Sequence, residues 1–229
     1  MVFQAVVFDA YGTLFDVYSI GTLAERLYPG QGAAISTIWR DKQIEYTRLI
    51  SLSDPDGEHG SRHYQPFWVL TREALRYALQ RLGLPQSPDH EAALMAQYAQ
   101  LSAFLENHAV LKRLRAHGVT TAILSNGNPE MLTPAVQSAG MADLLDHVIS
   151  VDGVRQFKTM PVAYGKVARH ITAEKGRVLL VYSNAWDVLG ATWFGFTTLW
   201  INRQGLPFET IGPRPAHTGA DLNALNTVA

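Results

Sequence analysis

The chain has 229 residues, 47% of them hydrophobic, and its 19 basic and 20 acidic side chains leave a net charge of −1. This balance gives no electrostatic reason to expect nucleic acid or an anionic membrane as a partner, and the lack of cysteine excludes disulfides, thiolate catalysis and cysteine-bound zinc. The N-terminus lacks the basic start and apolar stretch of a signal peptide, and no segment approaches the roughly 20 apolar residues of a membrane span, so we expect a cytoplasmic protein.

The first predicted element is a buried strand at residues 4–8, which is short, apolar and rich in valine. Residues 17–97 then show the apolar spacing of helices and no convincing strand. We interpret 17–97 as a helical cap inserted after the first strand, and residues 1–16 together with 98–229 as the core domain. The polar stretch 53–63, rich in chain breakers, is predicted to be a flexible loop within the cap.

Four more predicted strands alternate with helical patterns, and the tail beyond them is expected to be irregular apart from one short helix. These strands cover residues 119–125, 147–151, 177–183 and 197–201. Such alternation predicts the α/β class, with a parallel sheet covered on both faces. Active sites of such sheets lie at the carboxyl ends of the strands. Three polar residues stand at such ends: Asp9, Ser125 and Ser183.

Five segments in chain order carry a resemblance to a known family: FDAYGTLFD, WRDKQIEY, LSNGN, FK followed by P and Y, and SNAWD. Together they resemble the L-2-haloacid dehalogenases of the haloacid dehalogenase superfamily, and the match covers nearly the whole chain. The resemblance implies a Rossmann-like core with a helical cap, no cofactor or metal, and a homodimer. It also implies hydrolysis of short L-2-haloacids with inversion at C2, so that a small 2-haloacid, water and halide meet at the site.

Asp9 is the predicted nucleophile. A carboxylate that faces a carbon with a good leaving group can displace halide and form an ester, which water then hydrolyses. In phosphatases of this superfamily a second aspartate two residues later is the general acid, but here that position is Tyr11. Halide leaves as a stable anion and needs no proton, so Tyr11 is compatible with dehalogenation and argues against phosphoester hydrolysis. Taken alone, Asp9 is also explained by a helix N-cap.

Arg40 is the predicted contribution of the cap to the chemistry. The resemblance identifies it as the arginine that accepts halide, with Asn126 sharing that site, and an arginine always carries its charge. A solvated helix arginine is the plain alternative. The resemblance also implies an apolar substrate pocket, whose wall would strengthen the few polar contacts inside it. Its members, each of which alone is also explained by ordinary core packing, are Tyr11, Ile44, Phe67 and Trp186.

Ser125 and Asn126 follow the second predicted strand of the core. A hydroxyl and backbone N–H groups at a helix start can bind a substrate carboxylate, so we expect both residues at the substrate. Thr13, four residues after Asp9, lies in a tight turn from which its hydroxyl is expected to reach the oxygens of the nucleophile. Turn formation is the alternative role of Thr13.

Lys158 supplies a positive charge that would keep Asp9 ionised. Tyr164, six residues later, resembles the tyrosine that the family keeps beside this lysine. Asn184 and Asp187 complete the predicted site. Asp187 has two open roles, since it could hold Lys158 or activate the water that hydrolyses the ester.

Tyr182 is the main departure from the family pattern, because relatives carry two serines where this chain has Tyr182 and Ser183. We expect the tyrosine ring to enter the pocket and narrow it; the other possibility is that the ring turns away into packing. A second departure is the longer cap loop ahead of Phe67. Two alternatives to a dehalogenase stay open at this point: a phosphatase of the same fold, and a non-catalytic relative.

Overall fold

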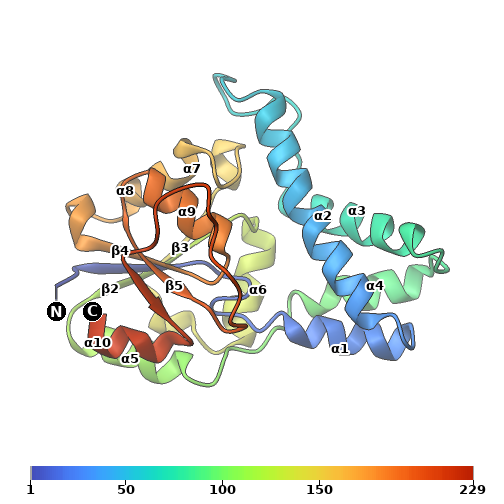
Figure 1. Ribbon diagram of the computed structural model, residues 1–229, viewed down its shortest axis with the longest axis horizontal. Helices are drawn as coiled ribbons and strands as arrows, with labels where there is room; N and C mark the ends of the chain where they lie inside the picture. Colours follow the sequence, from blue (N-terminus) through green and yellow to red (C-terminus); the bar gives the residue numbers. More distant parts are fainter. Residues whose placement is uncertain (1, 229) are drawn as a thin grey trace.

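The computed structural model describes residues 2–228 and contains a six-stranded parallel sheet in the order β3-β2-β1-β4-β5-β6 (Figure 1). The strands are β1 (Ala5–Phe8), β2 (Thr120–Ser125), β3 (His147–Ser150), β4 (Val178–Tyr182), β5 (Thr197–Ile201) and β6 (His217–Gly219). The five predicted strands are therefore confirmed to within one residue at each end, and so is the α/β class. β1 and β4 lie in the middle of the sheet and are buried along their whole length, as expected of parallel strands covered on both faces.

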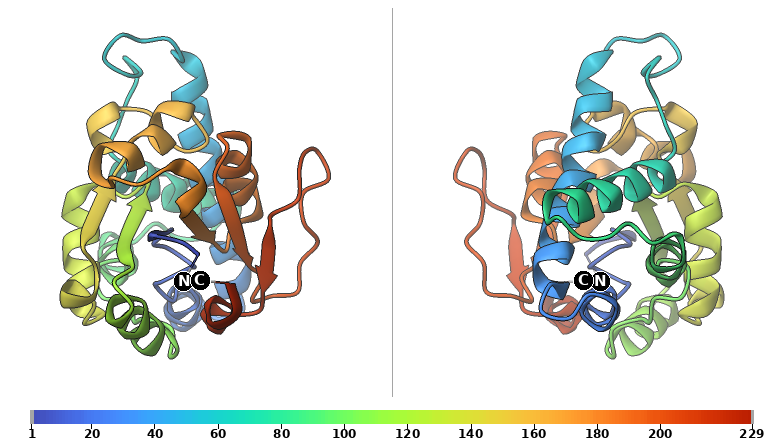
Figure 2. Two further views of the ribbon diagram at one scale, coloured as in Figure 1. Left: turned by 90° about the vertical axis from the view of Figure 1, so that its left-hand side faces the viewer. Right: turned by 90° about the vertical axis from the view of Figure 1, so that its right-hand side faces the viewer.

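β6 contradicts the irregular tail that the sequence predicts. This strand pairs with β5 at the edge of the sheet, with Leu199 opposite His217. Its three residues, HTG, have no apolar side chain, so backbone pairing alone defines it and no hydrophobic pattern signals it. Figure 2 shows the long connection between β5 and β6 as a loop that projects from this edge. The short helix expected after it is α10 (Leu225–Val228).

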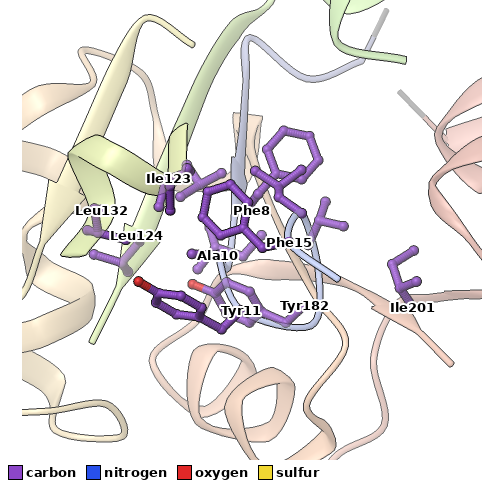
Figure 3. Close-up of a cluster of buried hydrophobic side chains, with 14 of the residues drawn as sticks. Phe8, Ala10, Tyr11, Phe15, Ile123, Leu124, Leu132, Tyr182 and Ile201 are labelled. Atoms are coloured by element: carbon purple, nitrogen blue, oxygen red, sulfur yellow. The ribbon is translucent and has the colours of Figure 1, made fainter. Parts of the chain in front are cut away.

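Helices cover the two faces of the sheet. α5 (Asn107–Ala116) and α10 lie on one face, and α7 (Pro161–Gly165), α8 (Val167–His170) and α9 (Ala185–Trp193) lie on the other (Figure 1). α6 (Pro129–Ser138) connects β2 to β3. Figure 3 shows the core that forms where the sheet meets the segment after β1, with Phe8, Phe15, Ile123 and Leu124 close together. Among residues 2–228, no helix is long and apolar enough to cross a membrane.

Four helices follow β1 and pack on one another beside the end of the sheet where β1 stops: α1 (Tyr18–Leu27), α2 (Gly32–Ser53), α3 (Phe67–Arg81) and α4 (Pro88–Gln97) (Figure 1). In α2, buried residues recur every four positions at Ile35, Trp39, Gln43 and Thr47, which places them on one stripe of the helix. This stripe packs on α3. α4 begins at Pro88, and the side chain of Ser87 caps it by accepting a hydrogen bond from the His90 backbone.

The polar stretch 53–63 forms a loop, as predicted, and the loop contacts the segment of the core just before Lys158. The backbone N–H of Ser61 donates to the carbonyl of Arg155, and the side-chain amide of Gln156 donates to the carbonyl of Asp54. The backbone N–H of Phe157 donates to the hydroxyl of Ser51, at the end of α2. These hydrogen bonds connect the helical region to the core at a second place besides the chain connection after β1.

Candidate active site

The carboxyl ends of three neighbouring strands bring polar side chains to one edge of the sheet. Asp9 directly follows β1, Ser125 is the last residue of β2, and Ser183 directly follows β4. β1 lies between β2 and β4 in parallel register, so the three ends lie next to each other. Gly12 then turns the chain with a φ of +90°, a left-handed conformation that favours glycine. The turn leaves the Asp9 side chain at the edge of the sheet while the chain departs towards α1.

Lys158 connects these ends through its ammonium group. Nζ donates to Asp9 Oδ1 at 3.0 Å, to Asp187 Oδ2 at 2.6 Å and to the carbonyl oxygen of Leu124 at 2.9 Å. An ammonium has three N–H donors, so these three bonds use all of them. The lysine is 1% exposed, and its charge is therefore balanced by carboxylates instead of water.

Asp187, in the first turn of α9, is held from two sides. Its Oδ2 accepts from Lys158, and its Oδ1 accepts from the hydroxyl of Tyr164 at 2.7 Å. Burial raises the pKa of Asp187 to about 6, although the adjacent ammonium of Lys158 pulls it down. Burial alone would lower the pKa of Lys158, but the carboxylates of Asp187 and Asp9 together raise it. The cluster thus contains one ammonium between the side-chain oxygens of Asp9 and Asp187.

The second carboxylate oxygen of Asp9 is linked to the helical region by hydrogen bonds of Asn184. Asn184 Nδ2 donates to Asp9 Oδ2 at 3.2 Å, and Asn184 Oδ1 accepts from Arg40 Nη2 at 3.3 Å. Arg40 lies on α2, so it crosses from the helices to the sheet. Its other terminal nitrogen, Nη1, donates to the side-chain oxygen of Gln43 at 2.6 Å. The predicted nucleophile, Asp9, and the predicted cap arginine, Arg40, therefore bond to the same amide group, that of Asn184.

A small cavity lies between Asp9 and the helices, with a volume of about 10 Å³, the room that about one water molecule needs. All of its lining residues are among those predicted from the sequence: Asp9, Tyr11, Arg40, Ile44, Phe67, Ser125, Asn126, Lys158 and Trp186. A wider cleft of about 730 Å³ shares Tyr11, Arg40, Ile44 and Trp186 with the cavity, and Ser183 and Asn184 also line it. The cleft connects the cavity wall to the surface.

Tyr11 forms the apolar floor of this cavity. Its ring lies 6.4 Å from the ring of Phe67 and 5.7 Å from that of Tyr98, measured between centroids. Among the described residues, its hydroxyl has no hydrogen-bond partner. Burial raises the pKa of the Tyr11 hydroxyl further above its ordinary value, so this group stays protonated.

Ser125 and Asn126 line the cavity as predicted, and their own bonds show how they are held. Asn126 Oδ1 accepts from the backbone N–H of Lys158 at 2.9 Å. The hydroxyl oxygen of Ser125 accepts from the backbone N–H of Gly127 at 3.0 Å. An amide oxygen only accepts, so the amide nitrogen of Asn126 is the part of this side chain that can donate to a bound anion.

Comparison with known proteins identifies the family. A family model described as haloacid dehalogenase-like hydrolase matches residues 3–195. The chain belongs to this family. It is 39% identical to (S)-2-haloacid dehalogenase H-109 of Pseudomonas putida, over 97% of this chain and 96% of the relative. It is 38% identical to haloacetate dehalogenase H-2 of Moraxella sp., over 97% and 96%.

Solved structures of haloacid dehalogenases agree with the fold of this family member. The L-2-haloacid dehalogenase RSc1362 is 55% identical, with a TM-score of 0.95 over 99% of this chain and 98% of that chain. The L-2-haloacid dehalogenase of Xanthobacter autotrophicus, in a structure with chloropropionic acid covalently bound, is 36% identical, with a TM-score of 0.88 and the same coverage.

Thr13 and Ser183 of this haloacid dehalogenase-like hydrolase bond to each other. The hydroxyl oxygen of Thr13 accepts from the backbone N–H of Ser183 at 2.9 Å. The expected bond from Thr13 to Asp9 is not the one that the structure contains, because the hydroxyl is turned towards the loop after β4. Thr13 therefore connects the loop after β1 to the loop after β4.

Tyr182 is where the prediction from sequence is wrong. The ring is fully buried and does not line the cavity, so it does not narrow the pocket. Its ring centroid lies 4.5 Å from Nζ of Lys158 instead. Figure 3 shows the ring among the core side chains near Tyr11. The ring lies beside the ammonium, where it is buried in the core and its apolar surface is removed from water. Tyr164 also lies outside the cavity, behind Asp187.

Gln43 is a residue of the site that motif reasoning misses in this hydrolase. It is fully buried and accepts the bond from Arg40, while its Nε2 donates to the hydroxyl of Thr71 at 2.7 Å and reaches the hydroxyl of Tyr98 at 3.5 Å. The signal was present in the spacing: Gln43 is a polar residue on the buried stripe of α2. A buried amide has to be hydrogen-bonded, so its position predicts a polar partner.

Proposed function

We propose that this protein hydrolyses short L-2-haloacids to D-2-hydroxy acids through an ester on Asp9. The observation that carries the proposal is the cavity in which the Asp9 carboxylate and the Arg40 guanidinium share walls with apolar side chains. A carboxylate nucleophile, a cation for the leaving anion and an apolar wall are what halide displacement needs. The relatives named above are (S)-2-haloacid and haloacetate dehalogenases, and the covalently bound chloropropionic acid in one of them supports an intermediate attached to the protein.

In the first step, a carboxylate oxygen of Asp9 attacks C2 of the haloacid. The new C–O bond forms as the carbon–halogen bond breaks, and halide leaves with the bonding electron pair towards Arg40. No proton is transferred, because halide is stable as an anion. Lys158 and Asn184 hold the Asp9 carboxylate by one bond on each oxygen, which fixes its orientation before attack.

Ser125 and Asn126 are the proposed anchors for the carboxylate of the substrate. Both line the cavity beside Asp9, and the amide nitrogen of Asn126 is available as a donor. The side chains of Tyr11, Ile44, Phe67 and Trp186 then surround C2 and its substituent. Exclusion of water by these side chains strengthens the attraction between Arg40 and the departing halide.

In the second step, water attacks the ester carbonyl on Asp9 and the bond from that carbonyl to the ester oxygen breaks. The 2-hydroxy acid leaves with the oxygen that came from Asp9 and takes one proton of the water on it, while the other proton is released to solvent as Asp9 becomes a carboxylate again. Of the two roles open to Asp187, we propose that it holds Lys158. Each of its oxygens already accepts a short bond, one from Lys158 and one from Tyr164. A carboxylate with both oxygens occupied is suited to holding its neighbours in place. It is less suited to removing a proton from water.

A phosphatase of the same fold is not favoured. Its general acid would stand at Tyr11, whose hydroxyl is buried and has a raised pKa, so that it is a poor proton donor to a leaving alkoxide. The hard cation that a phosphatase uses prefers oxygen ligands of the carboxylate type, and Tyr11 offers none at that position.

The division of the chain is also proposed: a cap at residues 17–97 and a core at 1–16 and 98–229. A homodimer, as the family resemblance implies, and a cytoplasmic location, as the sequence leads us to expect, complete the proposal. Light scattering after size-exclusion chromatography tests the dimer, since a single-chain mass of 25.3 kDa would contradict it. Cell fractionation tests the location.

The deciding experiment is a single turnover of chloroacetate in ¹⁸O water with enzyme in excess. Attack of water on the ester places the label in the Asp9 carboxylate, whereas direct attack on carbon places it in the hydroxy acid. Mass spectrometry of the Asp9 peptide separates the two outcomes, and unlabelled Asp9 after several turnovers excludes the ester. Chloro-, bromo- and fluoroacetate, both enantiomers of 2-chloropropionate and a panel of phosphate esters, each with and without Mg²⁺, then define the substrate class.

A further inference from the structure

The ammonium of Lys158 has one neighbour that is not a hydrogen-bond acceptor. Its three N–H groups are used by Asp9, Asp187 and the carbonyl of Leu124. The remaining contact is the ring of Tyr182, whose centroid is 4.5 Å from Nζ. Both side chains are almost completely buried, so the contact lies away from the surface of the protein.

We propose that Tyr182 is a positioning residue for Lys158, and that its ring forms a wall that holds the ammonium against Asp9 and keeps water out of the charge cluster. The inference rests on the proposed role of Asp9 as nucleophile. It extends that function, because it assigns a task to a side chain that lies outside the substrate cavity.

The ring carries this task and the hydroxyl does not. Among the described residues, the Tyr182 hydroxyl has no hydrogen-bond partner, and it is buried. The face of an aromatic ring attracts a cation through its quadrupole and requires no N–H donor. That suits an ammonium whose donors are all in use. A serine hydroxyl at this position would have to compete for a donor that already bonds Asp9, Asp187 or Leu124.

Removal of the ring would open space beside three charged groups. A water molecule enters a buried space when it finds two or more polar partners, and Lys158, Asp9 and Asp187 provide them. Such a water would take a donor from Lys158 and weaken its Coulomb attraction to Asp9. The carboxylate would then be held less firmly in its attacking orientation, so the chemical step would slow while substrate binding changed little.

Three variants test the inference in halide release from chloroacetate. Tyr182→Phe keeps the ring and is expected to retain the parent's kcat. Tyr182→Leu removes the ring, and kcat is expected to fall by roughly tenfold to thirtyfold while KM stays within about twofold of the parent value. This fall in kcat corresponds to the loss of a desolvated cation–ring contact. Tyr182→Met fills a similar length without an aromatic face and is expected to lose as much as the leucine variant, so it serves if Tyr182→Leu does not fold.

The outcomes separate this inference from the proposed function. If the parent enzyme leaves no label on Asp9 in ¹⁸O water, the proposed function fails and the inference fails with it. If the parent is labelled but Tyr182→Leu and Tyr182→Met keep its kcat, only the inference is wrong. A Tyr182→Phe variant that loses as much as Tyr182→Leu also overturns it, because the hydroxyl would then be the active part.

Discussion

The sheet side and the helix side of the site hold their cations in different ways. On the sheet side, Lys158 has three acceptors and an aromatic ring around it. Its two carboxylate partners stand just after β1 and in the first turn of α9. On the helix side, Arg40 reaches across from α2 to Asn184 over 3.3 Å, and Gln43 is its support within the helices. The sheet therefore determines the geometry of the nucleophile, whereas the leaving-group side depends on how α2 and α3 lie on the core.

This difference has a functional consequence. The cavity around Asp9 has room for about one water molecule, so a haloacid can enter only if one of the two sides moves. The sheet side is a network of paired, buried charges whose separation would leave carboxylates without partners. The helix side loses one long hydrogen bond when Arg40 leaves Asn184. We therefore expect opening on the helix side, and the following predictions address the two sides in turn.

The largest effect is expected from Lys158→Met, which removes the cation from the sheet side. Asp9 and Asp187 would then be buried like charges without an ammonium between them, and at least one of their pKa values would rise. We expect halide release to fall by roughly 10²–10³-fold and the free energy of unfolding to fall by about 3–5 kcal/mol. Halide release and urea unfolding at pH 7 measure both.

Lys112→Met is the matched control, since Lys112 lies exposed on α5, away from the site. It should behave as the parent in both measurements. A Lys158→Met enzyme with more than a tenth of the parent's rate would show that the ammonium does not hold the nucleophile.

The next effect in size tests the helix side through Arg40→Lys. A lysine keeps the charge, but it cannot direct two separate nitrogens at Gln43 and Asn184 as the guanidinium does. We expect a loss in kcat of roughly 10²-fold, since one positioned donor to a departing anion is worth about that much. Fluoroacetate should suffer more than chloroacetate or bromoacetate, because fluoride is the poorest leaving group.

Arg81→Lys controls for the substitution itself, because Arg81 is exposed at the end of α3. Equal losses with all three halides would contradict the assignment of Arg40 to the leaving group. In that case Arg40 would support the fold of α2 against the core.

That the sheet-side residues lie close together could be predicted from the sequence, for a physical reason. Asp9, Lys158 and Asp187 belong to short segments next to strand ends, and parallel strands bring such ends to one edge whatever the rest of the chain does. Gln43 belongs to no such segment, and its partners Thr71 and Tyr98 lie on elements whose packing no local pattern specifies. Gln43 stands in the same motif as Arg40, WRDKQIEY, but the motif does not reveal that its amide bonds the guanidinium, because that contact depends on the packing of α2.

Tyr182 and β6 show two other limits. The sequence places Tyr182 at a strand end, but the direction of its ring depends on the space beneath Lys158, which only the packed structure defines. β6 forms through backbone pairing with β5 and has no apolar pattern. Side-chain direction and edge pairing are both consequences of tertiary contacts, so neither could be derived from periodicity.

A smaller effect is expected from acidification, which acts on the sheet side through Asp187. Burial raises the pKa of this carboxyl to about 6, so it takes up a proton as the pH falls through that value and releases its hold on Lys158. We expect kcat to fall about tenfold per pH unit below pH 6. Its ordinary pKa is 3.8, so between about pH 6 and 4 the folded state binds more protons than the unfolded state at this group.

The sign of the stability change follows from that difference. As the pH falls from about 6 to 4, the contribution of Asp187 to the free energy of unfolding increases, so the loss of activity is expected without unfolding. Melting curves recorded at each pH of the rate profile check this. The Asp187→Asn enzyme should be slow at every pH and lack the step near pH 6; a step that persists in it must belong to another group.

The smallest of these effects concerns Gln43, on the helix side. The hydroxyl of Thr71 donates to the carbonyl of Phe67 at 2.7 Å, so it can only accept from the amide nitrogen of Gln43. This orients the amide, and its oxygen must then face Arg40. Gln43→Leu removes the acceptor for Arg40 and also the donor that bonds the hydroxyl of Thr71. We therefore expect kcat to fall about fivefold and the free energy of unfolding to fall by about 1–3 kcal/mol.

Gln43→Glu sharpens the same test. A carboxylate still accepts from Arg40 but cannot donate to Thr71, and it neutralises the charge that would attract halide. Gln43→Glu should therefore lose more activity with fluoroacetate than Gln43→Leu does, although it keeps the bond to Arg40.

Gln80→Leu, an exposed position on α3, should change stability by less than about 0.5 kcal/mol and leave kcat unaltered. If Gln43→Leu loses stability but keeps the parent's kcat for all three haloacetates, the amide supports only the packing of α2 on α3, and the helix side holds Arg40 without it.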